Sequence, residues 1–241
     1  MLCIFHFTGF RVLKFFNRLG VLQHTSEYVA GLEKQLAWKP SGTLIAASQI
    51  LPNKHSIIFF EKNGLKHGEF NLPYRSSSFM IDHLCWSNDS KVFLISGFEI
   101  NASVNDEKPT YHKTVQHLML YMQSNYHWYL KHQLQFDVTS TTNFIEDILW
   151  SEQDYFTLFV VSSNGKLCKR LFHNVVDVTA DAQMLVVDGD RLCVSDFART
   201  LIPPPMSNYA LKFNAQIVQL CYNDTYLAVY LNDDQIVVLK S

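Results

Sequence analysis

Hydrophobic and polar positions along the chain follow the pattern of short β-strands joined by tight turns. Apolar runs of about 4–8 residues alternate with clusters of Gly, Asn, Asp and Ser, and no window longer than about ten residues keeps a helical period. At residues 63–64, 164–165 and 188–189, an Asn-Gly or Asp-Gly pair joins two such runs. These dipeptides favour the turns of β-hairpins. The pattern therefore predicts an all-β chain.

A longer unit occurs four times and consists of an apolar residue, an aromatic anchor two positions later, a polar turn and an apolar strand. The aromatic anchors of the four copies are Trp38, Trp86, Trp150 and Tyr222. A four-stranded unit of about 40–50 residues is typical of a WD40-like β-propeller blade, and longer gaps leave room for insertions or further blades. We expect the anchors to form the core between blades rather than to contact a ligand.

Three consecutive prolines, at positions 203–205, interrupt this pattern between two strand-like runs. Proline lacks a backbone N–H and has a fixed φ, so the segment fits neither a central strand nor a helix interior. We interpret residues 201–207 as a polyproline II spacer between strands. The alternative is a docking ligand for a proline-recognising domain.

Composition and charge exclude some partners but identify none. Of the 241 residues, 48% are hydrophobic and 17% charged, and the net charge of −2 gives no indication of a nucleic-acid or membrane partner. The densest basic group is Lys166, Lys169 and Arg170. It is followed by an acidic group formed by Asp177, Asp181, Asp188, Asp190 and Asp196. We interpret both groups as solvated faces, with a binding patch as the alternative.

Cysteines and sequons point to different compartments. The five cysteines (Cys3, Cys85, Cys168, Cys193 and Cys221) occur singly, which is typical of reduced thiols in a cytoplasmic or nuclear protein. Three sequons, at Asn88, Asn101 and Asn223, would suit a secreted protein. However, Asn-Asp pairs also form tight turns, no secretory signal pattern is visible, and no apolar run has the ~18 residues of a membrane span. We favour turn chemistry and a cytoplasmic, possibly also nuclear, protein.

Residues with catalytic or metal-binding chemistry do not form a known motif. The phosphate-binding, nucleophile-elbow and H-E-x-x-H patterns are missing from the sequence. The pairs His112/His117 and His127/His132 are five apart, which puts their side chains on opposite faces of a strand. Asp188-Gly-Asp190 is better explained as a hairpin turn than as a calcium loop, and the aromatic run at 125–129 as a packed strand than as a base-stacking site. We therefore predict no catalytic, cofactor-binding or metal-binding residue.

Several stretches resemble one family. LAWKPSGTLIAAS, FFEKNGLKHGEFNLPY, NYHWYLKHQL and VVDGDRLCVSDFARTLIPPPMSNYALKF, in this order, are similar to the largest subunit of the Elongator complex, also called IκB kinase complex-associated protein. Together with RVLKFFNRLGVLQHTSEYVAGL they cover somewhat over half of the chain. Residues 97–114 depart from the family as an inter-strand insertion, and residues 138–182 match poorly and are shortened.

The resemblance implies a non-catalytic scaffold fragment. It implies later blades of a first propeller in residues 1–140 and opening blades of a second propeller in residues 141–241. It also implies partners: the radical-SAM acetyltransferase subunit, which performs wobble-uridine modification of tRNA, and a second propeller subunit. tRNA contact and homodimerisation belong to a region that this chain lacks. The alternative, favoured by the sequons, is a secreted or surface propeller that binds a ligand.

The ends of the chain suggest an incomplete ring. Residues 1–16 resemble a hairpin entered abruptly, residues 10–17 form a strand with no earlier partner, and residues 236–240 form a strand with no closing segment. Blades that lack neighbours leave apolar faces uncovered. We therefore expect the isolated chain to be poorly soluble or oligomeric.

Overall fold

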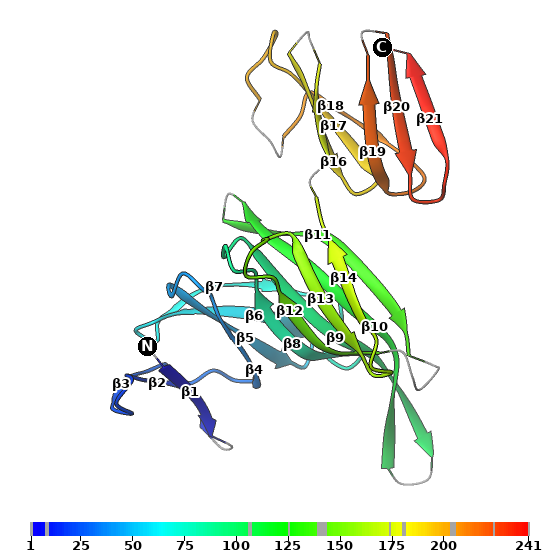
Figure 1. Cartoon of the computed structure of the whole chain (residues 1–241). Helices are drawn as coiled ribbons and strands as arrows, with labels where there is room; N and C mark the ends of the chain where they lie inside the picture. Colours follow the sequence, from blue (N-terminus) through cyan, green and yellow to red (C-terminus); the bar gives the residue numbers. More distant parts are fainter. Residues whose placement is uncertain are drawn as a thin grey trace. The chain divides into compact units, whose positions relative to one another are not determined.

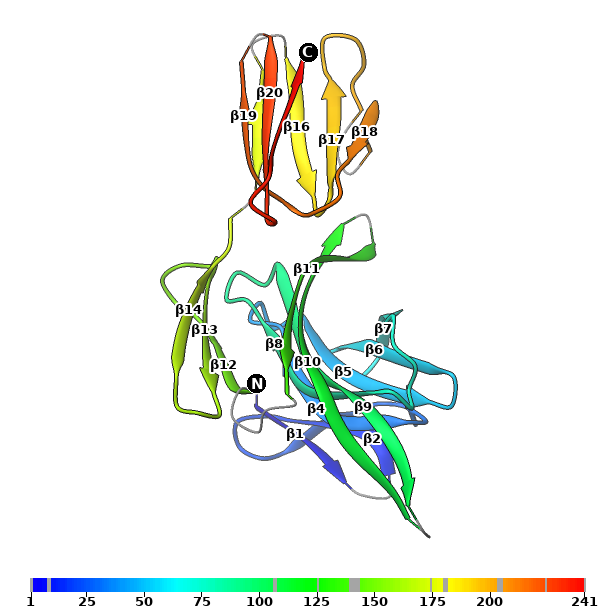
Figure 2. The same ribbon diagram turned by 90° about the vertical axis from the view of Figure 1, so that its right-hand side faces the viewer.

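The structure, a computed structural model, describes residues 2–7, 10–105, 108–124, 126–138, 144–173, 175–179, 182–202, 206–223 and 225–240. Side chains are described from residue 11 onward, except 102–111. Within these ranges the chain consists of 21 β-strands and connecting turns (Figures 1 and 2). The prediction of an all-β fold is confirmed. No helix in the described ranges has the length and apolar character needed to cross a bilayer.

Two four-stranded meanders form the largest part of the structure, and in each of them every strand pairs antiparallel with the next along the chain. The first sheet comprises β4 (Leu32–Trp38), β5 (Leu44–Leu51), β6 (Lys54–Glu61) and β7 (Lys66–Asn71). The second comprises β8 (Phe79–Trp86), β9 (Val92–Asn105), β10 (Lys108–Ser124) and β11 (His127–Asp137). This is the strand order of a propeller blade, as the repeated pattern predicts.

Four further sheets complete the structure. Three of them have three strands each: β1 (Leu2–Phe7), β2 (Phe10–Phe16) and β3 (Leu22–Thr25); β12 (Ile145–Trp150), β13 (Thr157–Ser162) and β14 (Leu167–Leu171); β19 (Ile217–Tyr222), β20 (Tyr226–Leu231) and β21 (Ile236–Lys240). The fourth has β15 (Val176–Val178), β16 (Gln183–Asp188), β17 (Arg191–Asp196) and β18 (Tyr209–Lys212). The expectation that the strand at 10–17 lacks an earlier partner is wrong, because β1 pairs with β2.

Packing divides the chain into two units, residues 1–171 and 172–241. The first unit contains β1 to β14 and the second contains β15 to β21. The core of the second unit joins its two sheets through Leu185, Leu192, Val194, Ile217, Leu227, Val229 and Leu231. The predicted boundary near residue 140 concerns which propeller each strand belongs to, and it stays a prediction.

Strands β5 and β6 show why some runs are apolar without alternation. Ile57 and Phe59 pack toward the β8–β11 sheet, whereas Ile58 and Phe60 pack toward β2 and its neighbours. Because this sheet is covered on both faces, consecutive positions of β6 are buried, as in strands with no solvent-facing side. A continuous apolar run in the sequence therefore indicates a strand whose sheet is covered by neighbours on both faces.

The predicted Asn-Gly and Asp-Gly hairpins are confirmed. At the β6–β7 turn, the Asn63 side-chain oxygen accepts a hydrogen bond from the Leu65 N–H at 3.0 Å, and Gly64 has a φ of +90°. A Cβ at Gly64 would lie 3.1–3.2 Å from the backbone of Thr25 and Ser26, so glycine also permits this close approach. The other two turns connect β13 to β14 and β16 to β17, with Gly165 and Gly189 at positive φ.

The predicted insertion at 97–114 forms an extension of the β9–β10 hairpin. Strand β8 pairs with β9 only up to Glu99, and β11 pairs with β10 only from Val115 onward. Between these limits β9 and β10 pair with each other alone, as Ile100 with Lys113 and Asn105 with Lys108 show. Figures 1 and 2 show this two-stranded ribbon extending past the rest of its sheet.

Candidate functional site

The most elaborate side-chain arrangement lies between the β4–β7 and β8–β11 sheets, an interface that we call the seam. Its centre is an aromatic cluster in which the Trp128 ring stacks on Phe59 at 4.8 Å and on Phe70 at 5.2 Å between ring centroids. Trp86 lies 4.7 Å from Phe93 in the same cluster. The predicted anchor Trp86 is therefore core between blades. Trp128 likewise belongs to a packed strand, as expected for the 125–129 run, so its face is not free to stack on a base.

The first strands of successive sheets lie next to each other along the seam. The Trp86 indole N–H donates to the Ala37 carbonyl at 3.3 Å, and the Gln35 amide donates to the Asp82 carbonyl at 2.7 Å. Trp38, the anchor of the preceding repeat, packs edge-on against Phe15 of β2. These contacts run sideways from sheet to sheet, which is how blades assemble into a propeller.

The β12–β14 sheet is attached to the β8–β11 sheet in the same manner. Gln116 forms two hydrogen bonds with the backbone of Ile145, donating at 3.0 Å and accepting at 2.5 Å. Asn88 donates to the Ser151 carbonyl at 2.8 Å. The third anchor, Trp150, is buried beside the Cys85 thiol. The anchor of the last copy, Tyr222, packs against the core of the second unit.

A polar network beside the seam is centred on the buried His117 and links β9, β10 and β11 to the β7–β8 connection. The His117 Nε2 atom lies 2.8 Å from Glu99 Oε1, and its Nδ1 lies 2.7 Å from the Gln133 amide nitrogen. Gln133 also donates to the Tyr74 hydroxyl at 2.9 Å. Since the amide nitrogen is a donor only, Nδ1 accepts and the imidazole proton lies on Nε2, facing Glu99. Every polar atom of the ring is thus satisfied by protein, which is typical of a structural histidine.

Phe79 packs tightly beside this network. Its ring stacks on Tyr74 at 4.2 Å between centroids and contacts the edges of His117 and of the buried His55. A Cβ on Gly97 would lie 2.5 Å from two carbons of the Phe79 ring, so only glycine fits there without movement. His55 Nε2 in turn lies 3.1 Å from Glu33. The cluster is filled by its own side chains.

Burial shifts the pKa of three groups in this region: Tyr74 and Tyr121 at the seam, and Cys85 on the side of β8 that faces the β12–β14 sheet. Burial raises the pKa of the Cys85 thiol to about 12, although the Trp150 indole opposes this shift. Burial also raises the pKa of Tyr74 and of Tyr121. A nucleophilic cysteine or a general base needs the opposite, a pKa brought toward the working pH. The seam therefore has the chemistry of a core and not of an active site.

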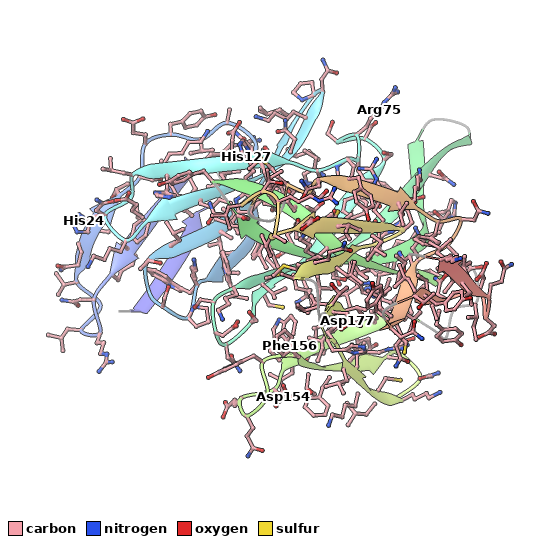
Figure 3. All side chains as sticks on the ribbon, turned by 90° about the horizontal axis from the view of Figure 1, so that it is seen from above. His24, Arg75, His127, Asp154, Phe156 and Asp177 are labelled. Atoms are coloured by element: carbon pink, nitrogen blue, oxygen red, sulfur yellow. The ribbon has the colours of Figure 1, made fainter. Side chains whose placement is uncertain are left out.

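The histidine pairs behave as strand geometry predicts. On β10, His112 is exposed and His117 is buried; on β11, His127 is exposed and His132 is half-buried, with its pKa lowered by burial. In the view of Figure 3, His24 and His127 lie apart. Among the described residues, no group of three or more His, Cys, Asp or Glu side chains could hold a metal ion.

Turn chemistry accounts for two of the three sequons. The Asn223 side chain accepts hydrogen bonds from the backbone N–H of Thr225 and of Tyr226, and Asn88 lies in the β8–β9 turn. Asn101 differs, because it is an exposed residue of β9. The same turn function explains Asp188-Gly-Asp190. The three prolines lie outside the described residues; the strands on either side, β17 and β18, pair with each other.

The polar network is the feature that sequence reasoning missed. Tyr74, His117 and Gln133 come from the β7–β8 connection, β10 and β11, and no local pattern links them. The one signal in the sequence is that His117 and Gln133 are polar residues on strands with apolar neighbours, which suggests buried hydrogen bonding without naming the partners.

Comparison with known proteins agrees with this architecture. The family described as the ELP1 first N-terminal beta-propeller matches residues 3–153, and the ELP1 N-terminal second beta-propeller matches residues 186–241. A solved chain from a study of two prolyl endopeptidases aligns with a TM-score of 0.45 and 11% identity, which is too distant to inform the fold or the function.

Three relatives with clear sequence similarity are much longer than this chain. Putative elongator complex protein 1 of Xenopus laevis is 37% identical over 89% of this chain, and Elongator complex protein 1 of Mus musculus is 36% identical over 97%. Elongator complex protein 1 of Saccharomyces cerevisiae is 32% identical over 81%. The chain spans 18% of the length of the first two and 14% of the third. Because the first-propeller family covers well over half of its residues, the chain belongs to the Elongator complex protein 1 family.

Proposed function

We propose that the chain is a non-catalytic scaffold segment of the Elongator complex, acting through blades that bind other subunits. The observation that carries this proposal is the seam, where buried aromatics from adjacent sheets pack together beside a polar network that includes Tyr74, and where burial raises the pKa of Tyr74. A site built this way supports rigid presentation of blade edges and loops. It offers no group poised for acid–base or nucleophilic chemistry.

The partners follow from the family. We propose that they are the acetyltransferase subunit and a second propeller subunit of Elongator, and that wobble-uridine modification of tRNA is supported through the assembled complex. Contact with tRNA and homodimerisation would then belong to other parts of the longer relatives. The location we propose is cytoplasmic or nuclear, because the cysteines occur singly and two of the three sequons lie in turns.

Affinity purification from the native organism tests this proposal. The tagged chain should recover an acetyltransferase subunit and a second propeller subunit by mass spectrometry, and its deletion should lower wobble-uridine modification in tRNA. The matched control is the Phe59→Ala variant, which should lose the partners because its blades no longer hold together. Recovery of the folded chain without either subunit, with unchanged tRNA modification, would overturn the proposal.

A further inference from the structure

Strand β14 is the outer edge of a sheet that has one strand fewer than the β4–β7 and β8–β11 sheets. In the β4–β7 and β8–β11 sheets, a fourth strand covers the outer edge of the third, as β7 covers β6 and β11 covers β10. The sheet order β12-β13-β14 ends at β14, and no described strand pairs with its other side (Figure 2). Free backbone groups on such an edge are a template for an added strand.

The hydrogen-bond pattern shows which residues of β14 face outward. The Ser162 N–H donates to the Lys166 carbonyl, and bonded and non-bonded pairs alternate along an antiparallel ladder. Cys168 and Arg170 therefore direct their backbone groups toward β13. Leu167, Lys169 and Leu171 direct theirs away from the sheet, where three N–H and three C=O groups are available.

The side chains of β14 specify what could pair with that edge. Leu167 and Leu171 are each 63% exposed and lie on one face with Lys169, while Arg170 lies on the other face. Lys166, Lys169 and Arg170 are all exposed, and none of them forms an ion pair with another described residue. Hydrogen bonds from the Thr157 hydroxyl and the Phe156 N–H lower the pKa of Asp154, a residue of the β12–β13 loop (Figure 3). Lys169 contributes a smaller charge effect that also lowers this pKa.

We propose that the β14 edge binds an extended acidic segment of a partner protein, which adds to the sheet as a fourth, antiparallel strand. The segment places acidic residues opposite Arg170 and Lys169 and apolar residues opposite Leu171 and Leu167. A second copy of this chain is a poor occupant, because β14 paired with β14 sets cations opposite cations. This inference does not depend on the proposed function, since it rests on β14 alone.

Fluorescence anisotropy with two labelled peptides on the whole chain tests the inference. The peptide Val-Glu-Glu-Thr-Val carries the expected pattern, and Val-Lys-Lys-Thr-Val is its charge-reversed control. The acidic peptide should bind, with affinity that falls as the salt concentration rises past about 0.1 M, and the basic peptide should not. Equal binding of the two peptides, or no binding of the acidic one, would overturn the proposal.

Three variants locate the site. K169E/R170E should weaken binding of the acidic peptide roughly tenfold or more and allow the basic peptide to bind. The reason is that the variant edge repels acidic residues and attracts basic ones. Lys169→Pro removes one outward N–H but leaves the hydrogen bonds between β13 and β14 intact. It should weaken binding of the acidic peptide and leave the melting temperature unchanged. Lys91→Glu, in the β8–β9 loop, is the matched surface control and should change nothing. Unaltered binding by both β14 variants would overturn the proposal, as would self-association that Lys169→Pro abolishes.

Discussion

The seam and the three-stranded β19–β21 sheet use the same strand order but bury very different amounts of apolar surface. At the seam, Phe59 and Phe93 are almost fully buried and each contacts several other rings. On the outer face of the β19–β21 sheet, Ile236 and Val238 remain 68% and 60% exposed. The difference teaches that a blade is stabilised by its neighbours: apolar strands form a core where a second sheet of the same unit covers them, and an exposed apolar surface where no described strand of that unit does.

Removal of a seam ring should produce the largest effect. We expect Phe59→Ala to lower the free energy of unfolding by about 3–5 kcal/mol, because it leaves a cavity among Phe70, Trp86 and Trp128. Urea denaturation followed by tryptophan fluorescence measures this. The matched change Ile236→Ala, on the outer face of the β19–β21 sheet, should lower the free energy of unfolding by under about 0.5 kcal/mol. Equal losses at the two positions would contradict the comparison.

Alkaline pH should weaken the packing between the β8–β11 and β12–β14 sheets through Cys85. The pKa of this thiol is raised from 9.0 to about 12 in the folded chain. Its contribution to the free energy of unfolding is therefore fully present below pH 9 and is lost as the pH rises from 9 to 12. The slope is about 1.4 kcal/mol per pH unit while only the unfolded chain ionises. Cys85→Ala should flatten this part of a stability–pH curve. The control Cys221→Ala, at an exposed position, should leave the curve unchanged.

The polar network should contribute less than the rings. Gln133→Ala leaves His117 Nδ1 and the Tyr74 hydroxyl without their shared donor, and we expect a loss of about 1–2 kcal/mol in thermal or urea unfolding. Gln135→Ala changes the same residue type two positions along β11, where the side chain is exposed, and should be close to neutral. A Gln133 variant as stable as the Gln135 variant would show that the network does not support the seam.

Substitutions on the outer face of the β19–β21 sheet should have the smallest effect on stability but a clear effect on self-association. Replacing Ile236 and Val238 with Ser should change the free energy of unfolding by under about 0.5 kcal/mol per site. The same variant should sediment as smaller species than the unmodified chain, since the apolar face is interrupted. If the unmodified chain is already a monodisperse monomer, the uncovered faces do not drive association.

Local patterns predicted the hairpins and the role of the aromatics, because both depend on neighbours in the sequence. Asn63-Gly64 specifies its turn through its own backbone and side chain, and Trp38 and Trp86 are one blade length apart. The spacing from Trp86 to Trp150 is longer because the extended β9–β10 hairpin lies between them. The fit of Phe79 against Gly97 could not be predicted, because it depends on how two distant segments approach each other. The expectation that residues 10–17 lack an earlier partner is wrong for a related reason: the partner of a strand depends on the topology, which the strand's own apolar pattern does not indicate.

The central claim, which rests on the proposed function, is that the sheets of this chain engage partners through their open edges and not through their interior. Hydrogen–deuterium exchange of the whole chain, alone and with the Elongator acetyltransferase and second propeller subunits, tests it most directly. Amides of β5, β6, β9 and β10 at the seam should exchange slowly in both samples. Amides of the three-stranded sheets, β14 above all, should exchange quickly alone and gain protection with the partners. Fast exchange at the seam, or no gain of protection in any sheet when the partners are added, would contradict the account.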